Sequence, residues 1–134
     1  MTSTIIYKGN LRCEATHIQS STVIETDAPT DNKGKGEKFS PTDLLCVSLA
    51  TCVLTTMGIK AMDMNIDLNN ATMEVTKHMA SEPRRVGKIV IKVSLPKLDL
   101  SDKDKTVLER AGNHCPVMKS LHPDVEKEIE YIWL

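Results

Sequence analysis

The sequence contains few aromatic residues and no excess of charge of either sign. Aromatics make up 3% of its 134 residues, and the formal net charge is -1. Proteins hold nucleic acids with basic surfaces and, for single strands, with aromatic stacking platforms. This composition therefore argues against a nucleic-acid partner, and it predicts that any pocket is lined mainly by aliphatic side chains and methionines.

A leader sequence and a membrane span are also missing from the pattern. The N-terminal stretch MTSTIIYKGNLR has no basic start followed by an apolar segment, so we expect no signal peptide and a cytoplasmic location. The uncharged run over residues 44–59 contains four hydroxyl side chains and falls short of the ~20 apolar residues that a span needs. We therefore expect a core helix, no membrane partner, and a single domain over residues 1–134.

The order of strand and helix signals predicts an α+β fold. Three short strands are expected over 3–9, 11–18 and 21–27, followed by an exposed loop over 28–40. Ser40 as N-cap, Pro41 at the first position and Asp43 in the first turn mark a helix to about Met62, apolar on all sides and so buried nearly all round. Two alternating strands (71–79 and 88–95), a helix from Ser101 to about Asn113, a short helix from Pro116 and a final strand complete the pattern β-β-β-α-β-β-α-α-β, which favours an antiparallel sheet.

Four cysteines are present, and none forms a CxxC pair. In a reducing compartment they are expected to be inert, metal-bound or catalytic. Cys13 and Cys46 are interpreted as core residues, because free cysteine packs as a small hydrophobe. Cys115 immediately precedes Pro116, so its sulfur is expected at a helix N-terminus, where a thiolate is stabilised. Cys52 lies about three helical turns from Pro41, too far for the helix dipole, and would need a cation from elsewhere in the fold.

Other chemistries have weaker support. His114, Cys115 and His122 are close in the chain, and Cys52 could complete a set of four metal ligands. That spacing fits no familiar zinc motif, so we expect no metal and no other cofactor. No G-x-S-x-G sequence that would mark a serine nucleophile is present.

Two segments together resemble a known family. SPTDLLCVSLATCVLTTM and, further along, HCPVMKSL resemble the paired cysteine motifs of the OsmC/Ohr family, the osmotically inducible and organic hydroperoxide resistance proteins. The resemblance covers essentially the whole chain. It implies an intertwined homodimer with antiparallel sheets around a long buried central helix. It also implies reduction of organic hydroperoxides in oxidative stress defence, with Cys52 as the peroxidatic thiol, Cys115 as the resolving thiol, and an external dithiol as reductant.

The resemblance further implies an arginine from the early strands and a glutamate directly after the proline of the helix. Arg12 matches the arginine and would favour the Cys52 thiolate and orient the peroxide. The alternative hypothesis is that Arg12 is a solvated arginine on a strand. The glutamate position is occupied by Thr42, and the acid comes one residue later, as Asp43. Asp43 is either the replacement or a residue that stabilises the helix dipole. Two alternatives therefore stay open: a non-enzymatic protein that binds a small hydrophobic ligand at the dimer cleft, and a dithiol redox sensor.

Overall fold

The computed structural model describes residues 1–134, which form two compact units, Met1–Leu45 and Cys46–Leu134. Each unit has its own three-stranded sheet. The order of strands and helices along the chain is the predicted one, with an additional short 3₁₀ helix, η1 (Thr30–Asn32), in the loop before the long helix. The prediction of a single domain over the whole chain stays a prediction.

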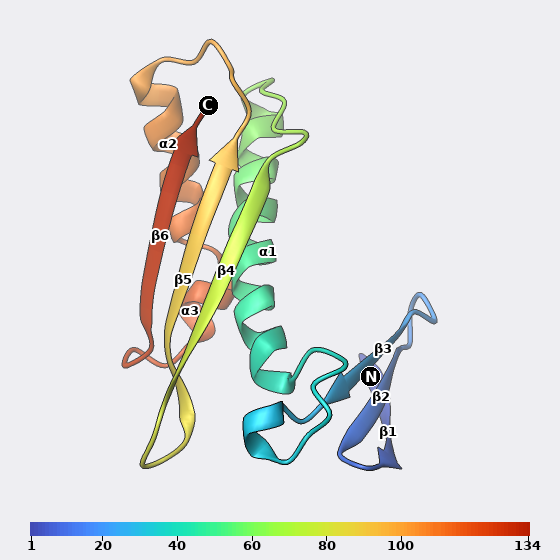
Figure 1. Ribbon diagram of the computed structural model, residues 1–134. Helices are drawn as coiled ribbons and strands as arrows, with labels where there is room; N and C mark the ends of the chain where they lie inside the picture. Colours follow the sequence, from blue (N-terminus) through green and yellow to red (C-terminus); the bar gives the residue numbers. More distant parts are fainter. The chain divides into compact units, whose positions relative to one another are not determined.

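The sheet of the N-terminal unit consists of β1 (Ser3–Gly9), β2 (Arg12–His17) and β3 (Val23–Asp27), paired antiparallel in that order (Figure 1). The turn between β1 and β2 passes through Asn10 and Leu11, which have φ values of 54° and 63°. The register places one set of mostly apolar side chains on one face of this sheet: Ile5, Tyr7, Cys13, Ala15, Ile24 and Thr26. That face stays largely uncovered, because Ile5 is 70% exposed and Tyr7 62%.

The long helix α1 (Pro41–Asp63) begins with a reciprocal cap. The Asp43 N–H donates to Ser40 Oγ (3.0 Å), and the Ser40 N–H donates to Asp43 Oδ2 (2.9 Å), so the predicted N-terminus is confirmed. By length and composition α1 could cross a membrane, but its buried stripe belongs to the hydrophobic core, as expected of a core helix. The stripe consists of Cys46, Leu49, Ala50, Val53, Met57 and Ala61.

The expectation that α1 is buried nearly all round is wrong for a single chain. Ile59 is 59% exposed and Met62 is 77% exposed, so part of the apolar surface of α1 outside the stripe faces solvent. The apolar pattern of the sequence is correct, but one chain supplies packing partners for only one side of the helix.

The sheet of the C-terminal unit consists of β4 (Thr72–Ala80), β5 (Arg85–Leu95) and β6 (Glu126–Trp133). β4 and β5 pair antiparallel as predicted, whereas β6 runs parallel to β5, so this sheet is mixed rather than antiparallel. The reason is the long connection: α2 (Asp102–Asn113) and α3 (Pro116–Ser120) carry the chain back to the end of the sheet where β5 began. Strand signals alone do not fix that direction.

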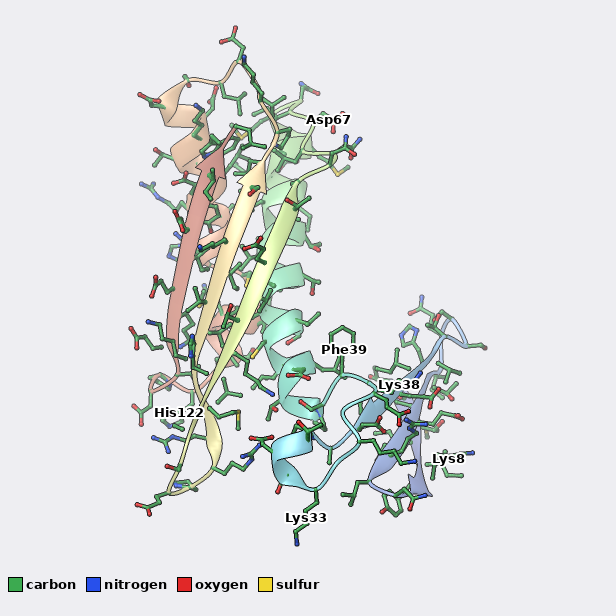
Figure 2. All side chains as sticks on the ribbon, viewed as in Figure 1. Lys8, Lys33, Lys38, Phe39, Asp67 and His122 are labelled. Carbon is green, nitrogen blue, oxygen red and sulfur yellow. The ribbon has the colours of Figure 1, made fainter.

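The hydrophobic core lies between this sheet and its helices, and Figure 1 shows α1 and α2 on the same side of the sheet. From Ile89 onward, every second residue of β5 points inward and is fully buried: Ile89, Ile91, Val93 and Leu95. The opposite face is charged, with the Lys88 ammonium 2.9 Å from Glu128, and Figure 2 shows polar side chains spread over the sheet. α2 begins within one residue of the predicted start, with Ser101 as its N-cap, because Ser101 Oγ accepts the Asp104 N–H. The core therefore has a layer of helices on one side only.

Candidate active site

Cys52 lies on α1 next to the buried stripe. Its neighbour Val53 is completely buried, whereas Cys52 itself is partly exposed and packs against the core from one side. Cys52 is therefore not completely enclosed by the protein. This position fits a thiol that meets a small molecule better than it fits a core residue.

Cys115 is the N-cap of α3, as the proline after it predicted. Its backbone is extended (φ -68°, ψ 156°), and its Sγ accepts the Met118 N–H at 3.4 Å. The side chain is fully buried. The fixed φ of Pro116 at the first position and the exposed N–H groups of the first turn explain why this short helix begins here.

The fold brings Cys52 and Cys115 together. The two side chains are neighbours, because Cys52 is among the groups that raise the pKa of the Cys115 thiol, although they come from α1 and from the N-terminus of α3. Both are free thiols in this structure. A sulfenic acid on one of them would therefore lie within reach of the other, which is the arrangement that disulfide chemistry requires.

The electrostatics of Cys115 correct one expectation. Burial raises the pKa of the Cys115 thiol, and the neighbouring Cys52 raises it further, while the N–H groups of Met118 and Val117 act in the opposite direction. The helix N-terminus is present as predicted, but its stabilisation of the thiolate is outweighed by the loss of solvent around a fully buried sulfur. Cys115 is therefore held as a thiol and is not the activated cysteine that its local sequence indicated.

The neighbouring histidines do not act on the thiols. His114 Nδ1 is 2.7 Å from the Arg110 carbonyl oxygen, at the C-terminal end of α2. His122, labelled in Figure 2, is exposed and accepts the Asp124 N–H at 3.1 Å. No group of three or more His, Cys, Asp or Glu side chains that could hold a metal ion is present.

The remaining cysteines lie apart from this pair. Cys46 is 2% exposed and belongs to the core, as predicted. Cys13 is only half-buried, because it lies on the apolar face of the N-terminal sheet that stays uncovered. The prediction that Cys13 is a core residue is therefore wrong for the single chain.

The two other predicted site residues belong to the N-terminal unit, whereas both thiols belong to the C-terminal unit. Asp43 makes the reciprocal cap with Ser40 at the start of α1. Arg12 Nε and Nη2 donate to Asp27 Oδ1 (2.8 Å) and Oδ2 (2.9 Å), so Arg12 is not simply a solvated strand residue. The contact of Arg12 with the thiols stays a prediction.

Sequence reasoning missed Asp27, which is 1% exposed and binds Arg12. A signal for this pair was present. Arg12 is the second residue of one predicted strand and Asp27 ends the next, so a short connection between antiparallel strands brings them close together. The structure pairs them directly opposite each other.

A groove of about 410 Å³ lies along the C-terminal half of α1 and the segment after it. Aliphatic residues and a methionine provide most of its lining, as predicted: Leu54, Ile59, Ala61, Met62, Ile66 and Leu68. The prediction is wrong for a smaller pocket of about 230 Å³ in the N-terminal unit, which is lined mainly by polar and charged residues: Lys8, Gly9, Asn10, Arg12, Glu25 and Lys35. Neither Cys52 nor Cys115 lines the groove. The groove and the thiol pair are therefore separate features of the same unit.

Comparison with known proteins gives the family. The sequence model of the family described as OsmC-like protein matches residues 34–130, which include both cysteines of the pair. The chain belongs to the OsmC-like family. No curated protein matches the chain.

Solved structures of OsmC-like proteins share the fold. A protein from Psychrobacter arcticus 273-4, provisionally named an osmotic stress induced and detoxification response protein, is 50% identical over 98% of this chain and 95% of its own, with a TM-score of 0.93. The organic hydroperoxide resistance protein OsmC of Legionella pneumophila is 15% identical over 98% and 97% of the two chains, with a TM-score of 0.72. The organic hydroperoxide resistance protein OhrB of Bacillus subtilis is 17% identical over 98% of each chain, with a TM-score of 0.67. The last two show the fold alone.

Proposed function

We propose that this OsmC-like protein reduces organic hydroperoxides to alcohols with Cys52 and Cys115 as a redox pair. One observation carries the proposal: two cysteines remote in the sequence become neighbours in the fold, one partly exposed and the other fully buried. The exposed member can meet a peroxide, and the buried member can reach only its neighbour. Membership in a family with proteins named for organic hydroperoxide resistance supports the choice of substrate.

The first step is attack of the Cys52 thiolate on the terminal oxygen of the hydroperoxide. The O–O bond breaks, the alkoxide leaves as an alcohol with a proton from solvent, and Cys52 becomes a sulfenic acid. Cys115 then loses its proton and attacks the Cys52 sulfur, a disulfide forms, and water leaves. An external dithiol reduces the disulfide, supplying two electrons and two protons and becoming a disulfide itself.

The pKa of Cys115 fits its role in the second step. A Cys52 thiolate is one cause that raises the pKa of the Cys115 thiol. When Cys52 becomes a neutral sulfenic acid, this negative charge disappears, and the N–H groups at the start of α3 remain to stabilise a Cys115 thiolate. Deprotonation of Cys115 is therefore easier after Cys52 has reacted than before.

The remaining elements of the proposal are a homodimer and Arg12 as the group that orients the peroxide. The uncovered apolar faces of α1 and of the N-terminal sheet support a second copy as partner. Asp43 stays a candidate for the acidic residue of the site, in addition to its capping role.

The substitution Cys52→Ser tests the proposal. With cumene hydroperoxide and a dithiol reductant, Cys52→Ser is expected to abolish peroxide consumption, because serine is not a comparable nucleophile. Cys115→Ser is expected to give a single turnover and a trapped sulfenic acid on Cys52. Cys13→Ser is the matched control and is expected to retain turnover. Unchanged consumption by Cys52→Ser would reject the assignment.

A second function is favoured by the aliphatic groove: binding of a small hydrophobic molecule without chemistry. Intact mass after one equivalent of hydroperoxide separates the two. Loss of two hydrogens indicates the disulfide, and an unchanged mass favours binding. A redox sensor, the third reading, would form the disulfide and turn over slowly with dithiol.

A further inference from the structure

A tyrosine on β6 is bound to the C-terminal end of α2. The Tyr131 hydroxyl donates to Asn113 Oδ1 at 2.7 Å, and the Glu109 carbonyl oxygen lies 3.3 Å from the same hydroxyl. Asn113 is the last residue of α2, and the ring of Tyr131 packs against the core. A phenol has one proton to donate, so the 2.7 Å contact is the stronger of the two. It connects the sheet of the C-terminal unit to the last turn of the helix.

The last turn of α2 also holds the backbone of Cys115. The Cys115 N–H donates to the Gly112 carbonyl oxygen at 3.3 Å, and the Sγ of the same residue accepts the Met118 N–H at 3.4 Å. One residue, His114, separates Cys115 from Asn113. Cys115 is therefore fixed between the end of α2 and the start of α3.

Of these two anchors, α2 is the stronger. α3 is five residues long, and none of its residues is fully buried. α2 has twelve residues, among which Leu108 and Gly112 are buried. A short helix without a buried side chain has little packing to fix its direction. The direction of the Cys115 sulfur therefore depends on where the last turn of α2 lies.

The Tyr131 hydroxyl fits closely against that turn. A Cβ on Gly112 would lie 2.8 Å from the Tyr131 hydroxyl oxygen and 2.9 Å from Met57 Cγ of α1, the helix that carries Cys52. The hydroxyl thus lies beside the residue whose carbonyl oxygen holds Cys115. A shift of Tyr131 or of the turn is transmitted to the cysteine, because close-packed groups have no free space to absorb it.

Tyr131 stays a hydrogen-bond donor while the cysteine reacts. Burial, together with the charges of Glu109 and Cys115, raises the pKa of Tyr131 to about 12. The phenol therefore keeps its proton at neutral and moderately alkaline pH, also when Cys115 is a thiolate. Its hydrogen bond to Asn113 is present in both protonation states of the cysteine.

We propose that Tyr131 is a positioning residue, which holds the end of α2 so that Cys115 attacks the sulfenic acid on Cys52. The proposal rests on the proposed function and concerns its second step. In that step the S–S bond forms and the S–O bond of the sulfenic acid breaks. The departing hydroxide takes up the proton that Cys115 has lost and leaves as water. Tyr131 gives up no proton and needs no contact with the peroxide.

The experiment measures the two steps separately in the full chain. Reduced protein is mixed with one equivalent of cumene hydroperoxide, the reaction is quenched at intervals, and intact mass is recorded. The sulfenic acid is one oxygen heavier than the reduced protein, and the disulfide is two hydrogens lighter. The variant is Tyr131→Phe, which keeps the ring and removes the hydroxyl.

Trp133→Phe is the matched control. Trp133 lies two residues further along β6, and its Nε1–H donates to Glu109 Oε1 at 2.9 Å. The control therefore also removes one hydrogen bond between β6 and α2, but not the one at the end of the helix. It separates a loss of general stability from a loss of position at Cys115.

Tyr131→Phe is expected to form the sulfenic acid at the wild-type rate and to convert it to the disulfide on the order of 10-fold more slowly, because small displacements of reacting groups have effects of this size. Asn113→Ala is expected to give the same delay, and the double variant no longer one, because the two residues act as a unit. Trp133→Phe is expected to keep both rates. Asn113 is exposed, so Asn113→Ala also tests the proposal if Tyr131→Phe fails to fold.

Three results would overturn the proposal. A wild-type rate of disulfide formation in Tyr131→Phe and Asn113→Ala separates Tyr131 from the second step and leaves the proposed function intact. An equal delay in Trp133→Phe shows a general loosening between β6 and α2 instead of a role at Cys115. If the wild type forms neither the sulfenic acid nor the disulfide, the proposed function itself is wrong, and the role of Tyr131 is rejected with it.

Discussion

The two units of this chain are each stabilised internally in a different way. All thirteen buried hydrophobic residues belong to the C-terminal unit, where helices cover one face of the sheet. The fully buried residues of the N-terminal unit are both polar, Asp27 and Ser40, and each is bound through hydrogen bonds. The C-terminal unit is therefore stabilised by burial of apolar surface, and the N-terminal unit by strand pairing and one ion-pair centre.

This difference supports the proposal that a second copy of the chain completes the N-terminal unit. A three-stranded sheet needs an apolar face packed against something to be stable in water. Here that face carries Ile5, Tyr7 and Ile24, which are 70%, 62% and 50% exposed. A second copy of the chain, as proposed above, would supply the missing layer.

The largest expected effect comes from placing a charge on that face. Ile24→Glu is expected to convert a dimer into monomer and to destabilise the fold, because a buried carboxylate without a partner is costly. The matched control is Val23→Glu, one residue earlier on β3. Both side chains are 50% exposed in one chain, but successive residues of a strand point to opposite faces. Molar mass by light scattering with size-exclusion chromatography measures the difference.

Equal molar masses for Ile24→Glu and Val23→Glu would contradict this interpretation of the N-terminal sheet. A monomeric wild type would do so as well. If only Val23→Glu lost the dimer, the covered face would be the one that carries Arg12 and Asp27. The interpretation of the N-terminal unit given above would then be wrong.

A smaller effect sharpens the interpretation of the C-terminal unit. A Cβ on Gly112 would lie 2.8 Å from the Tyr131 hydroxyl oxygen and 2.9 Å from Met57 Cγ, so Gly112→Ala is expected to destabilise by about 1–3 kcal/mol. Gly58 is also helical, and a Cβ there meets nothing within 4 Å. Gly58→Ala is therefore expected to stabilise by about 0.5–1 kcal/mol through helix propensity. Urea unfolding measures both.

The outcome for Gly58→Ala also tests whether a second copy covers α1. Gly58 lines the aliphatic groove, on the part of the helix that carries the exposed Ile59. A loss of stability in place of the expected gain would mean that another surface packs closely against this position in solution.

Much of the fold followed from local signals in the sequence. Ser40-Pro41 and Ser101 fixed two helix starts, and alternation fixed β4 and β5, because caps and periodicity act within a few residues. The parallel direction of β6 was missed, since it depends on where α2 and α3 carry the chain. The burial of α1 was overestimated, because an apolar helix does not reveal whether its partner is its own chain or another.

The site was predictable to the same extent. Cys115-Pro116 predicted the helix N-terminus, and the family resemblance predicted the pairing with Cys52. The raised pKa of Cys115 was not predictable, because burial of the sulfur is decided by the core around it. Asp27 was missed because its pairing with Arg12 arises from the register between two strands.

The smallest expected effect is a difference in the pH dependence of the two units. Arg12 lowers the pKa of Asp27 below its usual value. The stability from this pair is therefore present above that usual value and is lost as the pH falls through the folded-state pKa. In Asp27→Asn, the free energy of unfolding is expected to fall less steeply with decreasing pH than in the wild type. Calorimetry from pH 6 downward measures this acid limb of the stability curve. A wild-type acid limb in this variant would contradict the assignment of the ion-pair centre.

The stability of the C-terminal unit is expected to change at alkaline pH. Burial raises the pKa of Tyr131 from 10.0 to about 12, and burial also raises the pKa of the Cys115 thiol. The protonated forms are favoured in the folded state, so this stability is present below the unfolded-state pKa values and is lost as the pH rises through the folded ones.

Thermal unfolding followed by the single tryptophan, Trp133, reports on this unit. Tyr131→Phe and Cys115→Ser are each expected to flatten the alkaline limb and to leave the acid limb unchanged. Loss of stability at alkaline pH is thereby assigned to the C-terminal unit, because its buried Tyr131 and Cys115 must keep their protons.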